Sequence, residues 1–382
     1  MRGPNETLRG KYTDIDRIRQ TIDNGPYDAI IVTSPENTPY YSGFWNYDLR
    51  GIPERAHFVV WPRGGEPVWV VFERRLRNLK PEETFLTEVV PYEGEGTDSM
   101  RAVAEVLHSM SAEQGRVGIE GRNFSSGQLI DLQQRLPQAK FEDAQKFLES
   151  VRLIKTPAEV ELLTRMARWT AESIDTAFGD AKPGDTERQV AARMQYELLL
   201  RGADLIAFPV FGAGERSGAF HTIASDHVLQ SGMVLKTDFG GFRDGYFSDL
   251  ARTVVIGRAS DRQRDLHAKV TEIKHRIVDA IQPGMLASEA AGVGQHAYES
   301  LGLEYKGNVL GHSVGLGIHE SPQIYPWVEE PILPGMVMMI EVGTTDVSGD
   351  SFHVEDMILI NDRGAAYAEG IPQHGTLWEV GA

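Results

Sequence analysis

Two segments of this chain, residues 231–240 and 334–343, repeat one pattern of residue types. Each contains Gly-Met-Val near its start and ends with a carboxylate, an apolar residue and a glycine; the carboxylates are Asp238 and Glu341. An acidic residue in a strand of buried character is costly unless a partner offsets its charge. Because this happens twice at matched positions, the pattern predicts a duplicated strand with one shared chemical role.

Each copy is expected to form a β-hairpin with two acids. Asp249 follows Asp238, and Glu355 follows Glu341. Turn-forming residues lie midway between the members of each pair: Gly240, Gly241, Asp244 and Gly245 in the first copy, and Ser348, Gly349 and Asp350 in the second. Folding each ribbon at its midpoint places Asp238 opposite Asp249 and Glu341 opposite Glu355, roughly 5 Å apart at Cβ. Like charges so placed repel, and we therefore expect two divalent cations among the four carboxylates.

The repeat extends beyond the strands. Lys-Pro-Gly at residues 182–184 precedes a helical pattern that ends near Gly202, and Gln-Pro-Gly at residues 282–284 precedes a similar pattern that ends near Gly302. Two such units, each with helices followed by a hairpin, are expected to merge into one curved sheet. The helices would then cover its outer face, and the four acids would meet on its inner face.

The N-terminal part has a different pattern. A helix that Thr13 could cap is followed by a strand at residues 29–33 and by a hairpin of residues 57–61 and 68–72. Helical and strand patterns then alternate, which is typical of an α/β domain. A new helix is expected after Pro157, so we place the domain boundary near it and predict an N-terminal domain of residues 1–150 and a C-terminal domain of residues 151–382. The expected fold class is α/β (α+β).

Composition limits the partners of this chain. Its formal net charge of −17 argues against nucleic acids and anionic membranes, because those partners need a basic surface. The chain contains no cysteine, so oxygen and imidazole groups are its available metal ligands. Neither a signal segment nor an apolar run long enough to span a bilayer is evident, so we expect a cytoplasmic protein that acts on a small molecule or short peptide.

Three histidines complete the expected site. His312 lies in the glycine-rich segment 311–322 and is expected to be the fifth metal ligand. Four carboxylates and one imidazole suit a pair of Mn²⁺, Co²⁺, Fe²⁺ or Zn²⁺ ions, which at about 3.5–4 Å apart could share an activated water. His221 and His319 each precede the first acid of their hairpin by a similar stretch of sequence. We expect them to hold a substrate carbonyl oxygen or to pass a proton to a leaving nitrogen.

These features together resemble metallopeptidase family M24, the creatinase and aminopeptidase P family with the pita-bread fold. The resemblance covers nearly the whole chain and implies an N-terminal creatinase-type domain followed by a duplicated pita-bread domain. The spacing of the ligands is similar to that of microbial Xaa-Pro dipeptidases. The family's metal ligands fall on Asp238, Asp249, His312, Glu341 and Glu355, and its accessory histidines fall on His221 and His319. The resemblance also implies a homodimer.

By this resemblance, the chain would hydrolyse a C–N bond. A hydroxide shared by two metal ions would attack an amide carbonyl, and Glu341 would take its proton. His221 and His319 would act on the tetrahedral intermediate and the leaving nitrogen. An Xaa-Pro dipeptidase or aminopeptidase is the first hypothesis for the activity.

Three departures from the family pattern leave the substrate open. Asn308 stands where proline-specific members usually carry histidine, His353 where they usually carry arginine, and Ala251 where threonine or serine is usual. Asn308 and His353 are therefore candidate substrate-binding residues. Members of the same scaffold also act on small non-peptide metabolites, as ectoine- or creatine-type hydrolases or as a dimethylsulfoniopropionate-type lyase. A non-catalytic interaction module is a third hypothesis, which the intact ligand set disfavours.

Overall fold

The structure is a computed structural model that describes residues 10–45, 48–52, 55–77, 79–94 and 98–381. The chain divides into two compact units, Met1–Arg152 and Leu153–Ala382. The sequence placed the boundary between residues 150 and 151, and the assignment of the two parts as separate domains stays a proposal.

The first unit contains a mixed six-stranded sheet with strand order β4-β3-β2-β1-β5-β6. Strand β2 is antiparallel to both of its neighbours, β1 and β3, whereas the β3–β4, β1–β5 and β5–β6 pairs are parallel. Its elements are α1 (Ile15–Asp23), β1 (Ala29–Val32), α2 (Asn37–Ser42), α3 (Asp48–Gly51), β2 (Phe58–Pro62), β3 (Val68–Phe72), α4 (Glu73–Leu76), the 3₁₀ helix η2 (Pro81–Glu83), β4 (Glu88–Tyr92), α5 (Ser99–Ser109), β5 (Arg116–Ile119), α6 (Ser126–Arg135), β6 (Lys140–Asp143) and α7 (Gln145–Ser150).

Alternation along the strands gives this sheet two apolar faces. Ile31 and Val60 pack with residues of α5 and α6, and Trp61 faces the other side, where the ring of Tyr41 in α2 meets it edge-on. The expected helix cap was wrong by one residue. The carboxylate of Asp14 accepts a hydrogen bond from the backbone amide of Arg17 in the first turn of α1, whereas the Thr13 hydroxyl donates to the backbone carbonyl of Tyr40.

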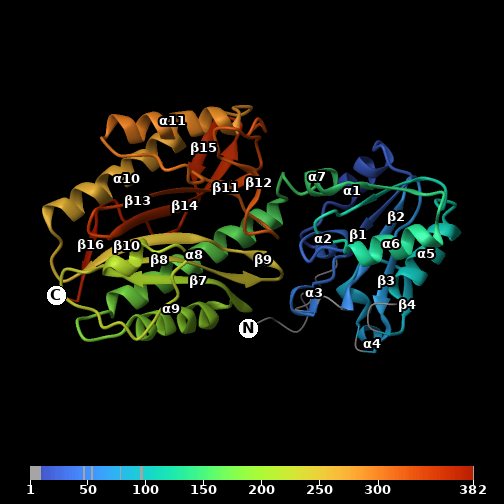
Figure 1. Ribbon diagram of the computed structural model, residues 1–382, viewed down its shortest axis with the longest axis horizontal. Coiled ribbons are helices and arrows are strands. Elements are labelled where there is room, and N and C mark those ends of the chain that lie inside the picture. Colours follow the sequence, from blue (N-terminus) through green and yellow to red (C-terminus); the bar gives the residue numbers. More distant parts are fainter. Residues whose placement is uncertain (1–9, 46–47, 53–54, 78, 95–97, 382) are drawn as a thin grey trace. The chain divides into compact units, whose positions relative to one another are not determined.

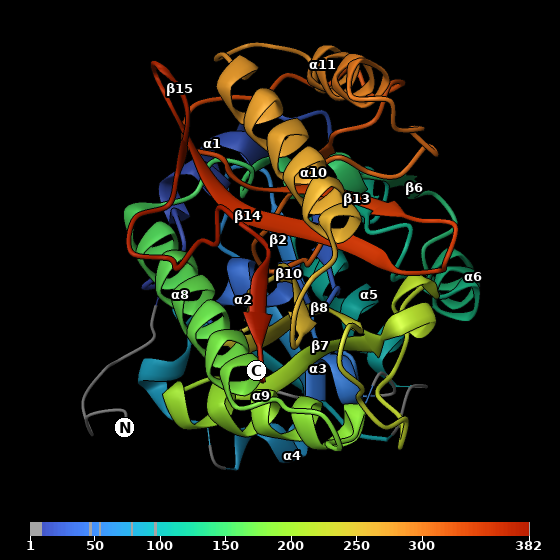
Figure 2. The same ribbon diagram turned by 90° about the vertical axis from the view of Figure 1, so that its left-hand side faces the viewer.

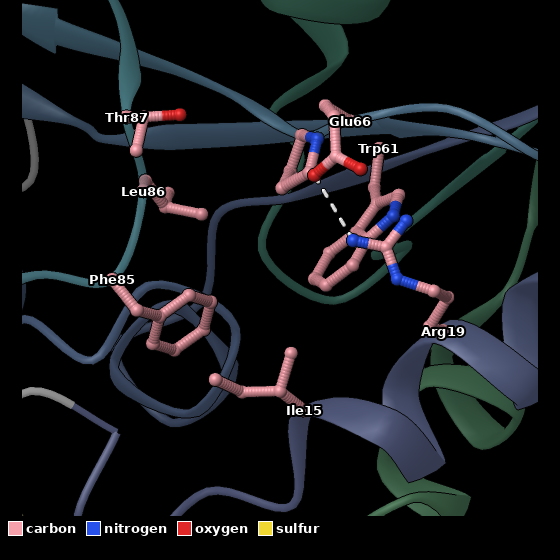
Figure 3. A pocket seen from close by; sticks show the side chains of 8 residues that line it. Ile15, Arg19, Trp61, Glu66, Phe85, Leu86 and Thr87 are labelled. Atoms are coloured by element: carbon pink, nitrogen blue, oxygen red, sulfur yellow. Dashed lines mark hydrogen bonds and ion pairs between the residues drawn. The ribbon is translucent and has the colours of Figure 1, made fainter.

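A cavity of about 320 Å³ lies in this unit (Figure 3). Its charged groups are Arg19 and Glu66, which form an ion pair of 3.0 Å. The guanidinium of Arg19 also lies 5.6 Å from the ring centre of Trp61. The rest of the wall is mostly apolar, with Phe85 and Leu86 opposite the indole ring. Because its two charges neutralise each other, this cavity does not resemble the acidic site that the sequence predicts.

The second unit contains two five-stranded sheets, with orders β16-β10-β8-β7, to which β9 adds beside β8, and β12-β11-β13-β14-β15. Its elements are α8 (Pro157–Gly179), α9 (Glu187–Arg201), β7 (Leu205–Ala213), the 3₁₀ helix η3 (Gly214–Gly218), β8 (Val234–Arg243), β9 (Tyr246–Phe247), β10 (Leu250–Ile256), α10 (Asp261–Ala280), α11 (Ala287–Ser300), β11 (His312–Ser313), β12 (Glu320–Gln323), β13 (Val337–Thr345), β14 (Ser351–Asn361), β15 (Gly364–Tyr367) and β16 (Trp378–Val380).

The internal repeat is visible in matched elements. Helices α9 and α11 follow turns in which Gly184 and Gly284 adopt positive φ angles of 93° and 85°. The amide of Gly184 donates to Leu229, and that of Gly284 donates to Ile332. Only glycine adopts this conformation without strain, which explains why Pro-Gly occurs at both positions. The two halves of the unit therefore start in the same way, as the sequence predicts.

Two sheets are present where the sequence predicted one curved sheet. Strands β10 and β14 are in contact, but the Thr253 hydroxyl replaces a backbone ladder between them: it donates to the carbonyl of His353 at 2.8 Å and accepts from its amide at 2.9 Å. Helix α10 packs on β13 and β14, α8 on β8 and β10, and α9 on β7 (Figures 1 and 2). Helices cover the sheets and leave the opposite faces for the site. The expected α/β class is confirmed.

None of the described helices has the length and apolar character needed to cross a membrane.

Candidate metal centre

The second hairpin has the expected register. In the β13–β14 pair, Glu341 lies directly opposite Glu355. The neighbouring residues Ile340 and Val354 point into the core beside α10. Because side chains alternate across a strand, the two glutamates point to the other face of the sheet. This part of the sequence prediction is confirmed.

The first hairpin has a register that differs by two residues from the expected one. Asp238 faces Ala251, not Asp249. The reason is the turn: Asp244 and Gly245 have φ angles of 54° and 89°, and two central residues of this kind form a tight two-residue hairpin turn. The sequence pattern placed the turn midway between Asp238 and Asp249, and the predicted pairing of these two residues was therefore wrong. A shift of two residues keeps the face, so Asp249 remains a diagonal neighbour of Asp238.

Next to Asp249, the backbones of the two hairpin strands approach each other so closely that position 240 requires glycine. A Cβ added to Gly240 would lie 1.7 Å from the carbonyl oxygen of Ser248. The hydroxyl of Ser248 also accepts a hydrogen bond of 3.0 Å from the amide of Gly241. These contacts hold the end of β9 against β8 and direct Asp249 toward Asp238.

His312 connects the two hairpins. It lies on β11, which pairs with β13, and only 1% of its surface is exposed. Its Nε2 atom lies 3.5 Å from Glu355, 3.6 Å from Glu341 and 3.9 Å from Asp249. Its Nδ1 atom lies 3.1 Å from the carbonyl oxygen of Ser313, a contact that favours a proton on Nδ1, so that Nε2 is the acceptor atom of the neutral ring.

The donor set fits divalent metal ions. Fully buried atoms without a hydrogen-bond partner among the described residues include Oδ1 of Asp238, Oδ1 of Asp249, Nε2 of His312 and Oε1 of Glu355. Buried polar atoms rarely lack partners, so several converging on one point need an explanation. Three overlapping groups have ligand atoms within 4.8 Å of one another: Asp238, Asp249 and Glu355; His312, Glu341 and Glu355; and Asp249, His312 and His319. Oxygen and imidazole donors in this number suit first-row divalent metals.

Burial and repulsion make three of the carboxyl groups weak acids. Burial raises the pKa of Asp249 well above its usual range, and the charges of Glu355 and Asp238 add to the effect. Burial, followed by the charges of Glu341 and Asp238, likewise raises the pKa of Glu355 well above its usual range. The pKa of Asp238 is also raised, chiefly by burial. Cations would relieve this strain by favouring the ionised forms.

Glu341 is the exception in the cluster. Burial acts to raise its pKa, but a hydrogen bond from His353 and the charge of His312 outweigh burial and hold the pKa below its usual range. The Nε2 atom of His353 lies 3.3 Å from Oε2 of Glu341. An ionised carboxylate at this position is a suitable proton acceptor.

The acids open into a cavity of about 460 Å³ that His221, His319, Asn308 and His353 also line. The ring of His319 lies 4.3 Å from that of His312, and burial of the ring, together with the His312 charge, lowers the pKa of His319 to about 4. His221 is exposed, has a positive φ of 48° and stacks on Phe220 at 3.8 Å. All the predicted site residues therefore line this cavity or touch the acids within it, although Asn308 is exposed at its edge.

Lys236 lines the same cavity, although the sequence pattern did not single it out. It lies on β8 two residues before Asp238 and is only 9% exposed. Burial lowers the pKa of its ammonium group, against the opposing charge of Asp238. The period of a strand could have identified it, because residues two apart share a face.

Comparison with known proteins identifies the family. Residues 161–362 match the model of metallopeptidase family M24, and residues 15–154 match that of the creatinase/prolidase N-terminal domain. The chain belongs to metallopeptidase family M24. The resemblance seen in the sequence is confirmed, and this M24 chain is an enzyme of the metal-dependent hydrolase class.

Similar proteins span nearly the full length of this M24 chain. The Xaa-Pro dipeptidase of Pyrococcus furiosus is 28% identical over 92% of this chain and 96% of its own length. The Xaa-Pro dipeptidase of Lactobacillus helveticus is 25% identical over 92% of this chain and 95% of its own. The solved prolidase from P. furiosus has a TM-score of 0.79 at 27% identity. The match covers 93% of this chain and 100% of the prolidase chain. The dipeptidase PepE from Mycobacterium ulcerans, with a TM-score of 0.85 at 24% identity and 100% coverage of both chains, shares the fold.

Proposed function

We propose that this M24 chain hydrolyses the peptide bond before proline in short Xaa-Pro substrates, with two divalent metal ions in its centre. The observation that carries the proposal is the cluster of buried, unpartnered ligand atoms at the base of a cavity of about 460 Å³. The dipeptidase names of its relatives give the substrate class. In this proposal the metals are held by Asp238, Asp249, His312, Glu341 and Glu355.

Bound divalent ions would supply Lewis-acid chemistry and would neutralise the carboxylates. Residues of the chain would accept the proton, stabilise the oxyanion and contact the leaving nitrogen. Glu341 is kept ionised by its contact with His353 and accepts a proton from the attacking water. His319 is neutral at neutral pH because its pKa is about 4, so it can donate a hydrogen bond to a developing oxyanion. His221, which also lines the cavity, is the group proposed to reach the leaving nitrogen.

An assay with matched dipeptides tests this function. We expect the purified protein, after chelation and return of Mn²⁺ or Co²⁺, to hydrolyse Leu-Pro or Met-Pro. Leu-Ala is the control, and its kcat/KM should be lower by roughly 10-fold or more, as expected when a pocket discriminates between side chains of different shape. Chelated protein without added metal should be inactive. Bound metal with no turnover of any Xaa-Pro substrate would contradict the proposal.

A second candidate is a hydrolase, or a lyase, for a small non-peptide metabolite. Asn308 and His353 favour it, because both lie at the cavity and both differ from residues usual in proline-specific members. Under this alternative the protein binds metal but does not hydrolyse Xaa-Pro dipeptides. It hydrolyses a cyclic amidine or a guanidino compound instead.

The family resemblance carries further proposals. These are a homodimer, manganese as one of the metals that the site accepts, a cytoplasmic location, and domains of residues 1–150 and 151–382. Light scattering of the purified protein measures the first directly, since a dimer doubles the chain mass of 42.4 kDa.

A further inference from the structure

We propose that Lys236 binds the carboxylate of the substrate's C-terminal residue, an inference that rests on the proposed function. Lys236 would thereby make the enzyme prefer dipeptides with a free C-terminus over C-terminally blocked or extended ones. It is a specificity-determining residue in this proposal and takes no part in bond breaking.

The position of Lys236 supports this role. The residue is 9% exposed, and it lines the cavity of about 460 Å³ together with Asp238. Within the described parts of the chain, no carboxylate forms a direct ion pair with its ammonium, although the charge of Asp238 acts on it. A lysine in this setting requires an anion, because a buried charge is stable only when it is paired.

The surroundings of Lys236 point to the substrate as that anion. Bound divalent ions would engage the carboxylates of Asp238, Asp249, Glu341 and Glu355 as ligands. None of these acids would then be free to pair with Lys236, and a substrate carboxylate would supply an anion beside it. Lys306 is the other lysine that lines the cavity, but its side chain is exposed, so water already solvates its charge.

The neighbouring imidazole is already engaged. Thr253 faces Lys236 across the β8–β10 pair, and its hydroxyl bonds to the backbone of His353. The side chain of His353 is directed to Glu341, at 3.3 Å. Lys236 is therefore the cation at this side of the acids that is placed to meet an anion.

The spacing along β8 matches the length of a dipeptide. Residues two apart in a strand are separated by roughly 6.6 Å and point to one face. In a dipeptide, the carbon of the terminal carboxylate lies about 3.8 Å or less from the scissile carbonyl carbon, because both flank one residue. A charge-assisted hydrogen bond adds about 2.8 Å. A scissile carbonyl near Asp238 thus brings the carboxylate within reach of Lys236.

The test compares Leu-Pro with Leu-Pro amide in the metal-loaded wild type and in Lys236→Met. For Leu-Pro we expect KM to rise roughly 10- to 100-fold in Lys236→Met, with little change in kcat, because a hydrogen bond to a charged group is lost. For the amide, KM should be the same in both proteins. Lys236→Arg should recover part of the affinity for Leu-Pro. Lys182→Met is the matched control, because Lys182 is exposed and is not among the residues that line the cavity; it should change neither substrate's KM by more than about 2-fold.

Metal content, measured on the same samples, separates the alternatives. A fall in bound metal in Lys236→Met, or an equal loss for Leu-Pro and its amide, would show that Lys236 supports the metal centre and would overturn the inference. An unchanged KM for Leu-Pro would overturn it as well. In each of these cases the wild type still cleaves Xaa-Pro substrates, so the proposed function stands. If the metal-loaded wild type cleaves neither Leu-Pro nor the amide, the proposed function fails, and the inference fails with it.

Discussion

Asp249→Asn is expected to abolish metal binding and yet to stabilise the metal-free protein. The substitution removes one carboxylate but keeps the shape of the side chain. Loss of a ligand shared by two of the candidate metal groups should lower kcat/KM by roughly 10³-fold or more. In the metal-free protein, the same change removes a buried carboxyl group whose ionised form is repelled by Glu355 and Asp238. The free energy of unfolding of the variant should therefore exceed that of wild type by about 1 kcal/mol or more.

The stability difference should depend on pH in a defined direction. The pKa of Asp249 in the folded protein lies well above its unfolded value of about 3.9, chiefly because the group is buried. The folded state therefore binds more protons, and its stabilising contribution is present below about pH 4 and is lost as the pH rises through the folded pKa. As the pH rises, the free energy of unfolding of the metal-free wild type should fall, and that of metal-free Asp249→Asn should fall by a smaller amount.

Urea unfolding of chelated samples at several pH values measures this difference, and mass spectrometry of the metals measures binding. Asp362→Asn is the control, because Asp362 is exposed on the turn between β14 and β15. Its stability should stay within about 0.5 kcal/mol of wild type. A variant that retained full metal content, or a stability gap between wild type and Asp249→Asn that narrowed with rising pH, would contradict the assignment of Asp249.

Asp356→Asn is expected to cause the largest loss of stability. Asp356 is 2% exposed, pairs with Arg252 at 2.7 Å and also forms an ion pair with Lys274. Removing its charge leaves two buried cations without a counter-ion, which costs about 3–5 kcal/mol. For a unit of this size the fall in Tm is roughly 6–20 °C. Metal affinity should fall too, because Arg252 donates to the backbone carbonyl of Glu355 at 2.6 Å.

Thermal unfolding of metal-free Asp356→Asn beside wild type checks this prediction, again with Asp362→Asn as the exposed control. The pH effect has the opposite sign to that of Asp249. Although burial acts to raise it, the charges of Arg252 and Lys274 hold the pKa of Asp356 below its usual range. Its contribution is therefore present above its unfolded pKa and is lost as the pH falls through the folded value. A variant as stable as wild type at neutral pH would show that the cluster does not support the fold.

The acids of the site could be predicted from the sequence because their positions repeat. Glu341 and Glu355 pair as expected, since the loop between them is symmetrical about its midpoint. Asp238 and Asp249 do not, because the tight turn at Asp244 fixes the register locally, and the sequence spacing of the acids has no influence on it. The face of each acid was nevertheless correct, since a shift of two residues preserves alternation.

Other features depend on contacts that no local pattern contains. The division into two sheets depends on the hydroxyl of Thr253, which replaces a backbone bond with β14. Lys236 gains its importance from burial in the cavity, because lysine in a strand is usually a solvated edge residue. The role of His353 as the partner of Glu341 depends on the pairing of β13 with β14. These relations between distant residues become visible only when the chain is folded.

Metal stoichiometry is the measurement that tests the central claim most directly. The protein should be chelated, reconstituted with Mn²⁺, freed of excess metal and analysed by plasma mass spectrometry, with Xaa-Pro hydrolysis followed during titration. We expect two ions per chain and activity that requires their binding. Wild-type protein that is folded and active with no bound metal would contradict the account, as would full metal occupancy in a variant that lacks both Asp249 and Glu355.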